Sequence, residues 1–165
     1  MKMPIAGLPE GEHEFCFDEP ASALGLGPGF SDVHVEALLE KTPNELHLMV
    51  KVETQVSCTC DRCLAEFSES LSSTYHMHYL YDASGTRRYD QAEVQVISPG
   101  TPSLDIAEDV SQTIQVAVPL KLLCKSTCKG LCPGCGKNLN DGPCECRPEP
   151  LAPQWDALRD LRIKE

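Results

Sequence analysis

The sequence has few aromatic residues, little positive charge and no long hydrophobic run. Aromatic residues make up 5% of the 165 residues, so Val, Leu and Ile must supply most of a core, for which the hydrophobic content of 41% is sufficient. No stretch approaches the roughly 20 apolar residues of a membrane-spanning helix, and residues 1–7 contain no apolar signal-peptide segment. We therefore expect a protein of the cytoplasm, or of an equivalent plastid-like compartment, with no membrane partner.

Sequence signatures of catalysis are also missing. There is no Gly-rich phosphate loop, no G-x-S-x-G nucleophile elbow and no H-E-x-x-H metal motif. The acidic residues lie along the polar faces of expected strands, where solvation is their usual role. We predict that the protein is not an enzyme and has no small-molecule substrate.

The scarcity of basic residues limits the choice of partner. Fourteen Lys and Arg stand against 25 Asp and Glu, which gives a net charge of −11. A surface of this charge repels a polyanion and attracts basic proteins. A basic protein is thus a physically easier partner than a bare nucleic acid.

Cysteine, in contrast, is abundant, with ten residues of which six lie between Cys124 and Cys146. The stretch Cys132-Pro-Gly-Cys135-Gly is typical of a metal knuckle, in which two thiolates flank a tight turn. A second pair, Cys144 and Cys146, follows an Asn-Asp-Gly-Pro turn. In a reducing compartment this spacing favours metal over disulfides, so we predict that these four thiolates bind one zinc ion.

The remaining cysteines allow a second zinc ion. Setting Cys16 and Cys58 aside leaves eight thiols, and we predict a second site made of Cys60, Cys63, Cys124 and Cys128. In an alternative, only one thiol of the 144/146 pair binds metal and Cys128 replaces the other. A thioredoxin-like role for the 60/63 pair is disfavoured because strands are expected on both of its sides. Cys16 is predicted to be a small buried hydrophobic residue.

Alternation of apolar and polar residues predicts an antiparallel sheet. Expected strands span residues 13–17, 32–40, 45–56, 66–81 and 93–97, and the loop at 58–63 places its knuckle at the tip of a hairpin. Residues 41–44 are expected to form a turn. The Gly- and Pro-rich residues 20–29 favour turns or a linker over a core element.

One main helix is predicted after the strands. Asp105 and Glu108 have capping-box spacing, apolar residues recur at helical intervals from Ile106, and Pro119 ends the run. A short helix at 154–163 would follow, anchored by Trp155, Leu158 and Leu161. The fold class is therefore α+β: a twisted antiparallel sheet or partly closed barrel, one main helix and a C-terminal cysteine-rich zinc minidomain. The expected segments are 1–30 (strand and Gly/Pro-rich stretch), 31–120 (sheet and helix), 121–150 (zinc-binding) and 151–165 (short helix).

The histidines give a weaker signal. His76 and His78 form an H-x-H pair that can chelate metal, but a solvated polar strand face is the favoured interpretation. The other three, His13, His34 and His47, are isolated in the sequence and indicate no site.

Three of these motifs together resemble the YceD family, the large ribosomal RNA subunit accumulation proteins of bacteria and plastids. They are Cys60-Asp-Arg-Cys63, the segment from Cys124 to Cys146 with Lys129-Gly-Leu-Cys-Pro and Asn138-Leu-Asn140 at fixed places, and the tail from Pro153 to Leu161. The resemblance covers residues 45–165. It implies a non-catalytic role in accumulation of large-subunit rRNA, with precursor rRNA or a ribosomal protein as partner. Some members lack much of the C-terminal cysteine set, which implies that the sheet and the 60/63 knuckle are the shared working part.

Two other classes of function remain open at this point. A thiol-redox or zinc-sensing switch, such as a redox-regulated holdase chaperone, pairs C-x-C with C-x-x-C, and both spacings occur here in reversed order and at a shorter separation. A small zinc-ribbon transcription accessory lacks support because the sequence shows no basic or aromatic nucleic-acid face beyond a few lysines.

Overall fold

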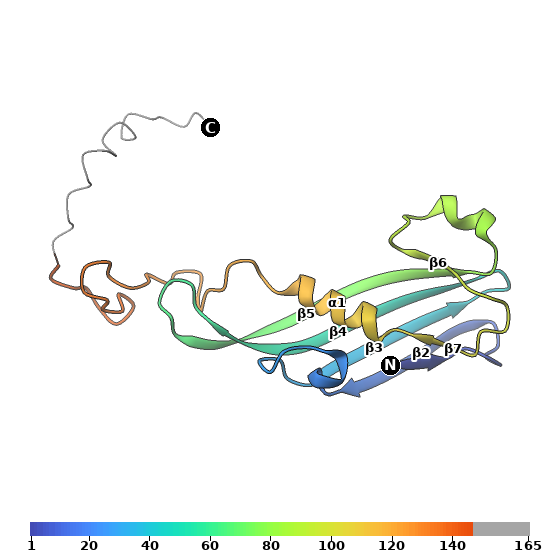
Figure 1. The fold of residues 1–165 in the computed structure, drawn as a ribbon, viewed down its shortest axis with the longest axis horizontal. Coiled ribbons are helices and arrows are strands. Elements are labelled where there is room, and N and C mark those ends of the chain that lie inside the picture. The colour runs from blue at the N-terminus through green and yellow to red at the C-terminus, as the bar shows by residue number, and fades with distance from the viewer. Residues whose placement is uncertain (147–165) are drawn as a thin grey trace, which may run out of the picture. The chain divides into compact units, whose positions relative to one another are not determined.

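The computed structural model describes residues 1–146 and divides into two compact units (Figure 1). The first, here called the sheet unit, comprises Met1–Cys58 and Glu66–Leu122. The second, the cysteine unit, comprises Thr59–Ala65 and Leu123–Glu165. The helix predicted at 154–163 lies outside the described residues.

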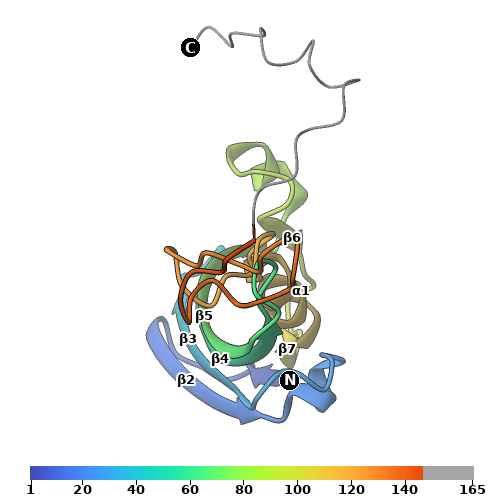
Figure 2. The same ribbon diagram turned by 90° about the vertical axis from the view of Figure 1, so that its left-hand side faces the viewer.

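A five-stranded sheet with the order β2-β3-β4-β5-β6 forms most of the sheet unit. Strands β2 to β4 pair antiparallel, as predicted, whereas β6 pairs parallel to β5, so the sheet is mixed and its last strand departs from the antiparallel pattern. The strands follow an arc without closing into a barrel (Figure 2). Their bounds are β2 Gly11–Glu19, β3 Val33–Lys41, β4 Glu45–Thr59, β5 Glu66–Leu80 and β6 Val94–Val96.

A second, two-stranded sheet pairs β1 (Lys2–Pro4) antiparallel with β7 (Ser103–Asp105). Neither strand was predicted, because each has only three residues and shows too little alternation to be recognised. Met3 and Leu104 face each other in this pair and are almost completely buried. The pairing therefore attaches the N-terminus to the segment just before the helix.

The alternation in β4 explains why it forms the centre of the sheet. Leu46, Leu48 and Val50 are each 0% exposed, while the residues between them are more accessible to solvent. On the neighbouring strand β3, Leu39 lies opposite Leu48 and Ala37 lies opposite Val50. We call the side of the sheet that these residues bury the inner face, and the opposite side the outer face.

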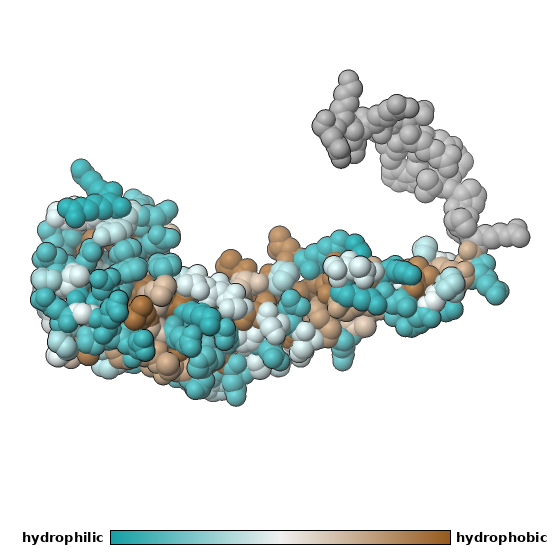
Figure 3. Space-filling view, turned by 180° about the vertical axis from the view of Figure 1, so that it is seen from behind, coloured by the Kyte–Doolittle hydropathy of each residue, from teal (hydrophilic) through white to brown (hydrophobic). Residues whose placement is uncertain are grey.

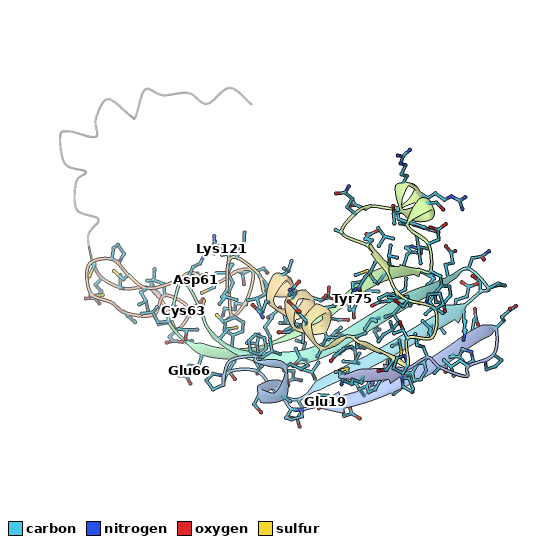
Figure 4. All side chains as sticks on the ribbon, turned by 45° about the vertical axis from the view of Figure 1, so that its right-hand side comes forward. Glu19, Asp61, Cys63, Glu66, Tyr75 and Lys121 are labelled. Carbon is cyan, nitrogen blue, oxygen red and sulfur yellow. The ribbon has the colours of Figure 1, made fainter. Side chains whose placement is uncertain are left out.

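Helix α1 (Ala107–Ala117) covers the inner face and packs chiefly against β5, on which Tyr75 lies beside it (Figure 4). Ile106, Val110 and Ile114 are buried as expected from their helical spacing. The capping box is only half formed. The Asp105 carboxylate accepts hydrogen bonds from the backbone N–H of Ala107 (3.2 Å) and from the N-terminal ammonium (3.1 Å), but Glu108 accepts one from Gln112 instead of capping.

The segment at 20–29 contributes to the core, contrary to the prediction of a linker. It contains a 3₁₀-helix, η1 (Ala21–Leu24), and its residues Ala21, Leu24 and Leu26 are buried in the main cluster. Gly25 ends this helix with a φ of 69°, which favours glycine. The glycines and prolines thus shape tight turns between aliphatic residues that pack inward.

The prediction that Cys16 is buried was also wrong. Cys16 is exposed, because its register opposite Glu36 places it on the outer face.

Two loops are closed by local hydrogen bonds. Thr42 and Glu45 close the turn predicted at 41–44, and Asp82 caps a 3₁₀-helix, η2 (Ala83–Arg88). Within residues 1–146, no helix is long and apolar enough to cross a membrane.

Candidate metal centres

Two tight turns in the cysteine unit share one backbone hydrogen-bond pattern. In the loop between β4 and β5, the N–H of Cys60 donates to the carbonyl of Ala65 and the N–H of Leu64 donates to that of Cys60, both at 2.9 Å. Figure 4 labels Cys63 in this loop. Leu64 has a φ of 59°, a left-handed conformation that is unusual for a bulky residue. This is the hairpin-tip knuckle expected from the sequence.

The second turn repeats the pattern with glycine at the left-handed position. The N–H of Cys132 donates to the carbonyl of Lys137 (2.8 Å), and the N–H of Gly136 donates to that of Cys132 (2.9 Å). Gly136 has a φ of 73° and corresponds to Leu64. Both turns hold two cysteines at an i, i+3 spacing, so that each supplies half of a four-thiolate site.

The first group of four thiols, here called cluster A, consists of Cys60, Cys63, Cys124 and Cys128. All four Sγ atoms lie within 4.8 Å of one another; the Cys60–Cys128 distance is 3.8 Å and the Cys63–Cys124 distance is 3.6 Å. In a tetrahedral zinc site with Zn–S bonds of about 2.3 Å, the sulfur atoms are about 3.8 Å apart. Three of the four cysteines are buried and Cys124 is partly exposed. Cluster A therefore has the ligands and the spacing to hold a metal ion.

Side chains and backbone around cluster A hold the chain in place. Asn140 donates its amide N–H to the Cys128 sulfur (3.3 Å) and accepts from the Lys129 backbone (2.9 Å). Arg62 donates from Nη1 to the Cys128 carbonyl (2.7 Å), and its own carbonyl accepts from Leu131 (3.0 Å). Such outer contacts orient metal ligands. In the sequence Asn140 is only part of a motif, because its contact joins an amide to a sulfur twelve residues away.

The second group, cluster B, consists of Cys132, Cys135, Cys144 and Cys146. Cys132 and Cys144 are closest, with sulfur atoms 3.2 Å apart. Cys132 is buried and Cys144 is partly exposed, but Cys135 and Cys146 are exposed. The structure thus brings together the same two sets of four that the sequence predicted. Both thiols of the 144/146 pair join cluster B, and Cys128 belongs to cluster A.

Hydrogen bonds distribute negative charge unevenly within each cluster. The backbone N–H groups of Cys124, Arg62 and Cys63 lower the pKa of Cys60 to about 6, and the N–H of Cys135 contributes most to lowering the pKa of Cys132 to about 6. Burial raises the pKa of Cys124 to about 12, and the neighbouring thiols of Cys135 and Cys132 raise that of Cys146 to about 12. A divalent cation would relieve this mutual repulsion and favour four thiolates.

His47, which was expected to be isolated, lies beside the His76 and His78 pair. On the outer face, His47 stacks on His78 with ring centroids 4.6 Å apart, and its Nε2 lies 3.4 Å from Nδ1 of His76. Among residues 1–146, clusters A and B are the groups in which three or more candidate metal ligands meet.

The geometry of both clusters suits a structural metal ion. Four thiolates complete a tetrahedral shell and leave no coordination position for an activated water molecule. All ten cysteines are free thiols, with no disulfide bond among them.

The chain matches a known protein-family model. The model described as "Large ribosomal RNA subunit accumulation protein YceD" matches residues 48–162, which is more than half of the chain and includes both clusters. Searches of curated proteins and of solved structures give no match.

Proposed function

Because the chain belongs to the YceD family of large ribosomal RNA subunit accumulation proteins, we propose that it supports accumulation of this RNA as a non-catalytic binding factor. The family name indicates only the result, which is accumulation of the RNA. The binding partner is part of our proposal. The candidates are a basic ribosomal protein of the large subunit and the precursor rRNA. The absence of an open metal position in either four-thiol set is in keeping with binding rather than catalysis.

We propose zinc as the ion of clusters A and B. Thiolate ligands in a tetrahedral arrangement favour zinc over Mg²⁺ or Ca²⁺, which prefer oxygen ligands. Cys60, Cys63, Cys124 and Cys128 would hold one ion, and Cys132, Cys135, Cys144 and Cys146 the other. The ions would be structural, stabilising a small unit that has little hydrophobic core of its own.

The charge distribution favours a protein partner over RNA. The sheet unit has six Lys and Arg against eighteen Asp and Glu, a net charge of −12, whereas the cysteine unit has eight against seven, a net charge of +1. Each zinc tetrathiolate adds −2, which brings the cysteine unit to about −3. Neither unit then offers the positive surface that RNA binding requires, so a basic large-subunit ribosomal protein is the favoured partner.

A salt titration tests this choice. We expect zinc-loaded protein to bind at least one purified basic large-subunit ribosomal protein at low salt, with an affinity that falls as salt rises, because rim charges are screened. A transcript of precursor large-subunit rRNA should not bind at the same low salt. Binding to the RNA alone, with steep weakening by salt, would contradict the protein partner and support direct RNA contact.

One observation supports the alternative of a redox or zinc-sensing switch: Cys135 and Cys146 of cluster B are exposed. We expect both ions to stay bound under mild peroxide, since coordination protects thiolates held in a complete shell. Release of one equivalent of zinc with disulfide formation and a gain of holdase activity would instead favour the switch. Metal content and aggregation of a client protein are the measurements.

A further inference from the structure

The outer face of the sheet contains a hollow of about 370 Å³. Its floor includes Leu38 and Met49, which lie opposite each other on β3 and β4. Met49 is 37% exposed, although most large apolar residues of the sheet are buried. Cys16, the exposed cysteine of β2, also lines the hollow. A solvent-facing sheet surface thus has an apolar centre.

Carboxylates surround this centre at positions set by the strand register. Glu14 lies opposite Leu38, so that Glu14, Leu38 and Met49 form one row across three strands. In the next row, Glu36 lies between Cys16 and Lys51. Glu14 and Glu36 therefore line the hollow from neighbouring rows.

Negative charge extends over the rest of the outer face. Strands β2–β5 present eight carboxylates and one lysine there. The lysine, Lys51, is paired with Glu36 (3.3 Å) and Glu53 (2.9 Å). In the space-filling view, hydrophilic residues cover much of the sheet unit, with apolar patches between them (Figure 3). The eight carboxylates are Glu12, Glu14, Asp18, Glu36, Glu40, Glu45, Glu53 and Glu66.

We propose that this outer face binds an extended, basic segment of a ribosomal protein, with an apolar side chain of that segment seated in the hollow. The proposal rests on the proposed function and assigns the surface that performs it. Along β3, Glu36, Leu38 and Glu40 point to the same side at alternate positions, about 7 Å apart. A segment with the pattern basic-x-apolar-x-basic presents matching side chains at the same interval.

Charge complementarity excludes RNA as the occupant of this face. Phosphates would meet eight carboxylates, and the one lysine of β2–β5 on this face is already paired with two of them. Lys and Arg side chains of a protein can instead reach the carboxylates at the rim, while an aliphatic side chain removes Leu38 and Met49 from water.

The test uses zinc-loaded full-length protein and each purified basic large-subunit ribosomal protein. Glu14→Gln/Glu36→Gln is compared with Glu93→Gln/Glu108→Gln, which makes the same charge change at exposed positions off this face. We expect the first pair to weaken binding about tenfold at low salt and to flatten the salt dependence, and the control pair to change it less than twofold. Met49→Ala should weaken binding roughly fivefold at both low and high salt, because contact with an apolar side chain is not screened.

Cys16 supplies a readout of position. The Cys16 thiol is exposed on this face, so the bound segment should slow alkylation of Cys16 by iodoacetamide. Peptide mass spectrometry measures the rate of this alkylation. Three outcomes would overturn the assignment of this face. They are an unchanged rate of Cys16 alkylation, an equal weakening of binding by the two pairs of Glu→Gln substitutions, and protection of Cys16 by precursor rRNA. If the wild-type protein binds no ribosomal protein, the proposed function with a protein partner fails as well. The two results distinguish a wrong surface from a wrong partner.

Discussion

Replacing Cys60 by serine is expected to remove one of two bound zinc ions. Cys60 is completely buried in cluster A, and serine leaves three thiolates around a vacant ligand position. We expect the free energy of unfolding to fall by about 4 kcal/mol, which corresponds to a fall in Tm of roughly 10 °C for a chain of this length. Cys132→Ser should likewise lose one equivalent, from cluster B. Metal analysis of protein purified under reducing conditions, together with thermal unfolding, measures both effects.

Cys16→Ser is the matched control, because Cys16 is exposed and belongs to neither cluster. It should retain two equivalents of zinc and the wild-type Tm. Retention of both ions in the Cys60 variant would show that the knuckle between β4 and β5 does not hold a structural ion. A loss of both ions from either single variant would show that the two sites are not independent.

Gly130→Ala is expected to disrupt cluster A without removing a ligand. Gly130 has a φ of 76°, and a Cβ atom there would lie 2.9 Å from the carbonyl oxygen of Arg62, which belongs to the backbone and cannot rotate away. That carbonyl accepts the hydrogen bond from Leu131 that joins the two segments of the cluster. Strain and the displaced backbone together should cost about 2–4 kcal/mol and weaken zinc affinity.

Gly136→Ala separates backbone strain from the clash. Gly136 has a φ of 73°, but a Cβ atom there would meet nothing within 4 Å. Only the left-handed conformation is penalised, at about 1 kcal/mol. Competition with a chromophoric zinc chelator and thermal unfolding compare the two variants. Equal effects would mean that the close approach of Gly130 to Arg62 has no energetic consequence.

Local pattern was enough to predict the central strands and the two sets of thiols. Strand β4 was recognisable because its alternation runs unbroken from Leu46 to Val56. The thiols could be grouped because eight remain after Cys16 and Cys58 are set aside, and because i, i+3 spacing joins Cys60 with Cys63 and Cys132 with Cys135 in knuckles. The alternation and the knuckles lie within a few neighbouring residues, whereas the assignment of Cys124 and Cys128 to the distant 60/63 knuckle came from the count of the remaining thiols.

Features that depend on distant parts of the chain were missed. The parallel pairing of β6 and the pairing of β1 with β7 join segments that the sequence alone does not bring together. Cys16 was misplaced because its side of the sheet is set by register opposite Glu36, and an apolar residue type gave the wrong side. His47 was considered isolated for the same reason, although it meets His76 across neighbouring strands.

The composition of cluster A has a topological consequence. Its ligands come from chain positions 61 to 68 residues apart, and β5, β6, β7 and helix α1 all lie in the chain between them. An ion bound there closes a loop of that length much as a disulfide would, and restricting the unfolded chain in this way contributes about 4 kcal/mol. Unlike a disulfide, the closure forms in a reducing environment and is reversible. The supply of the ion would then decide when a newly made chain acquires its full resistance to unfolding.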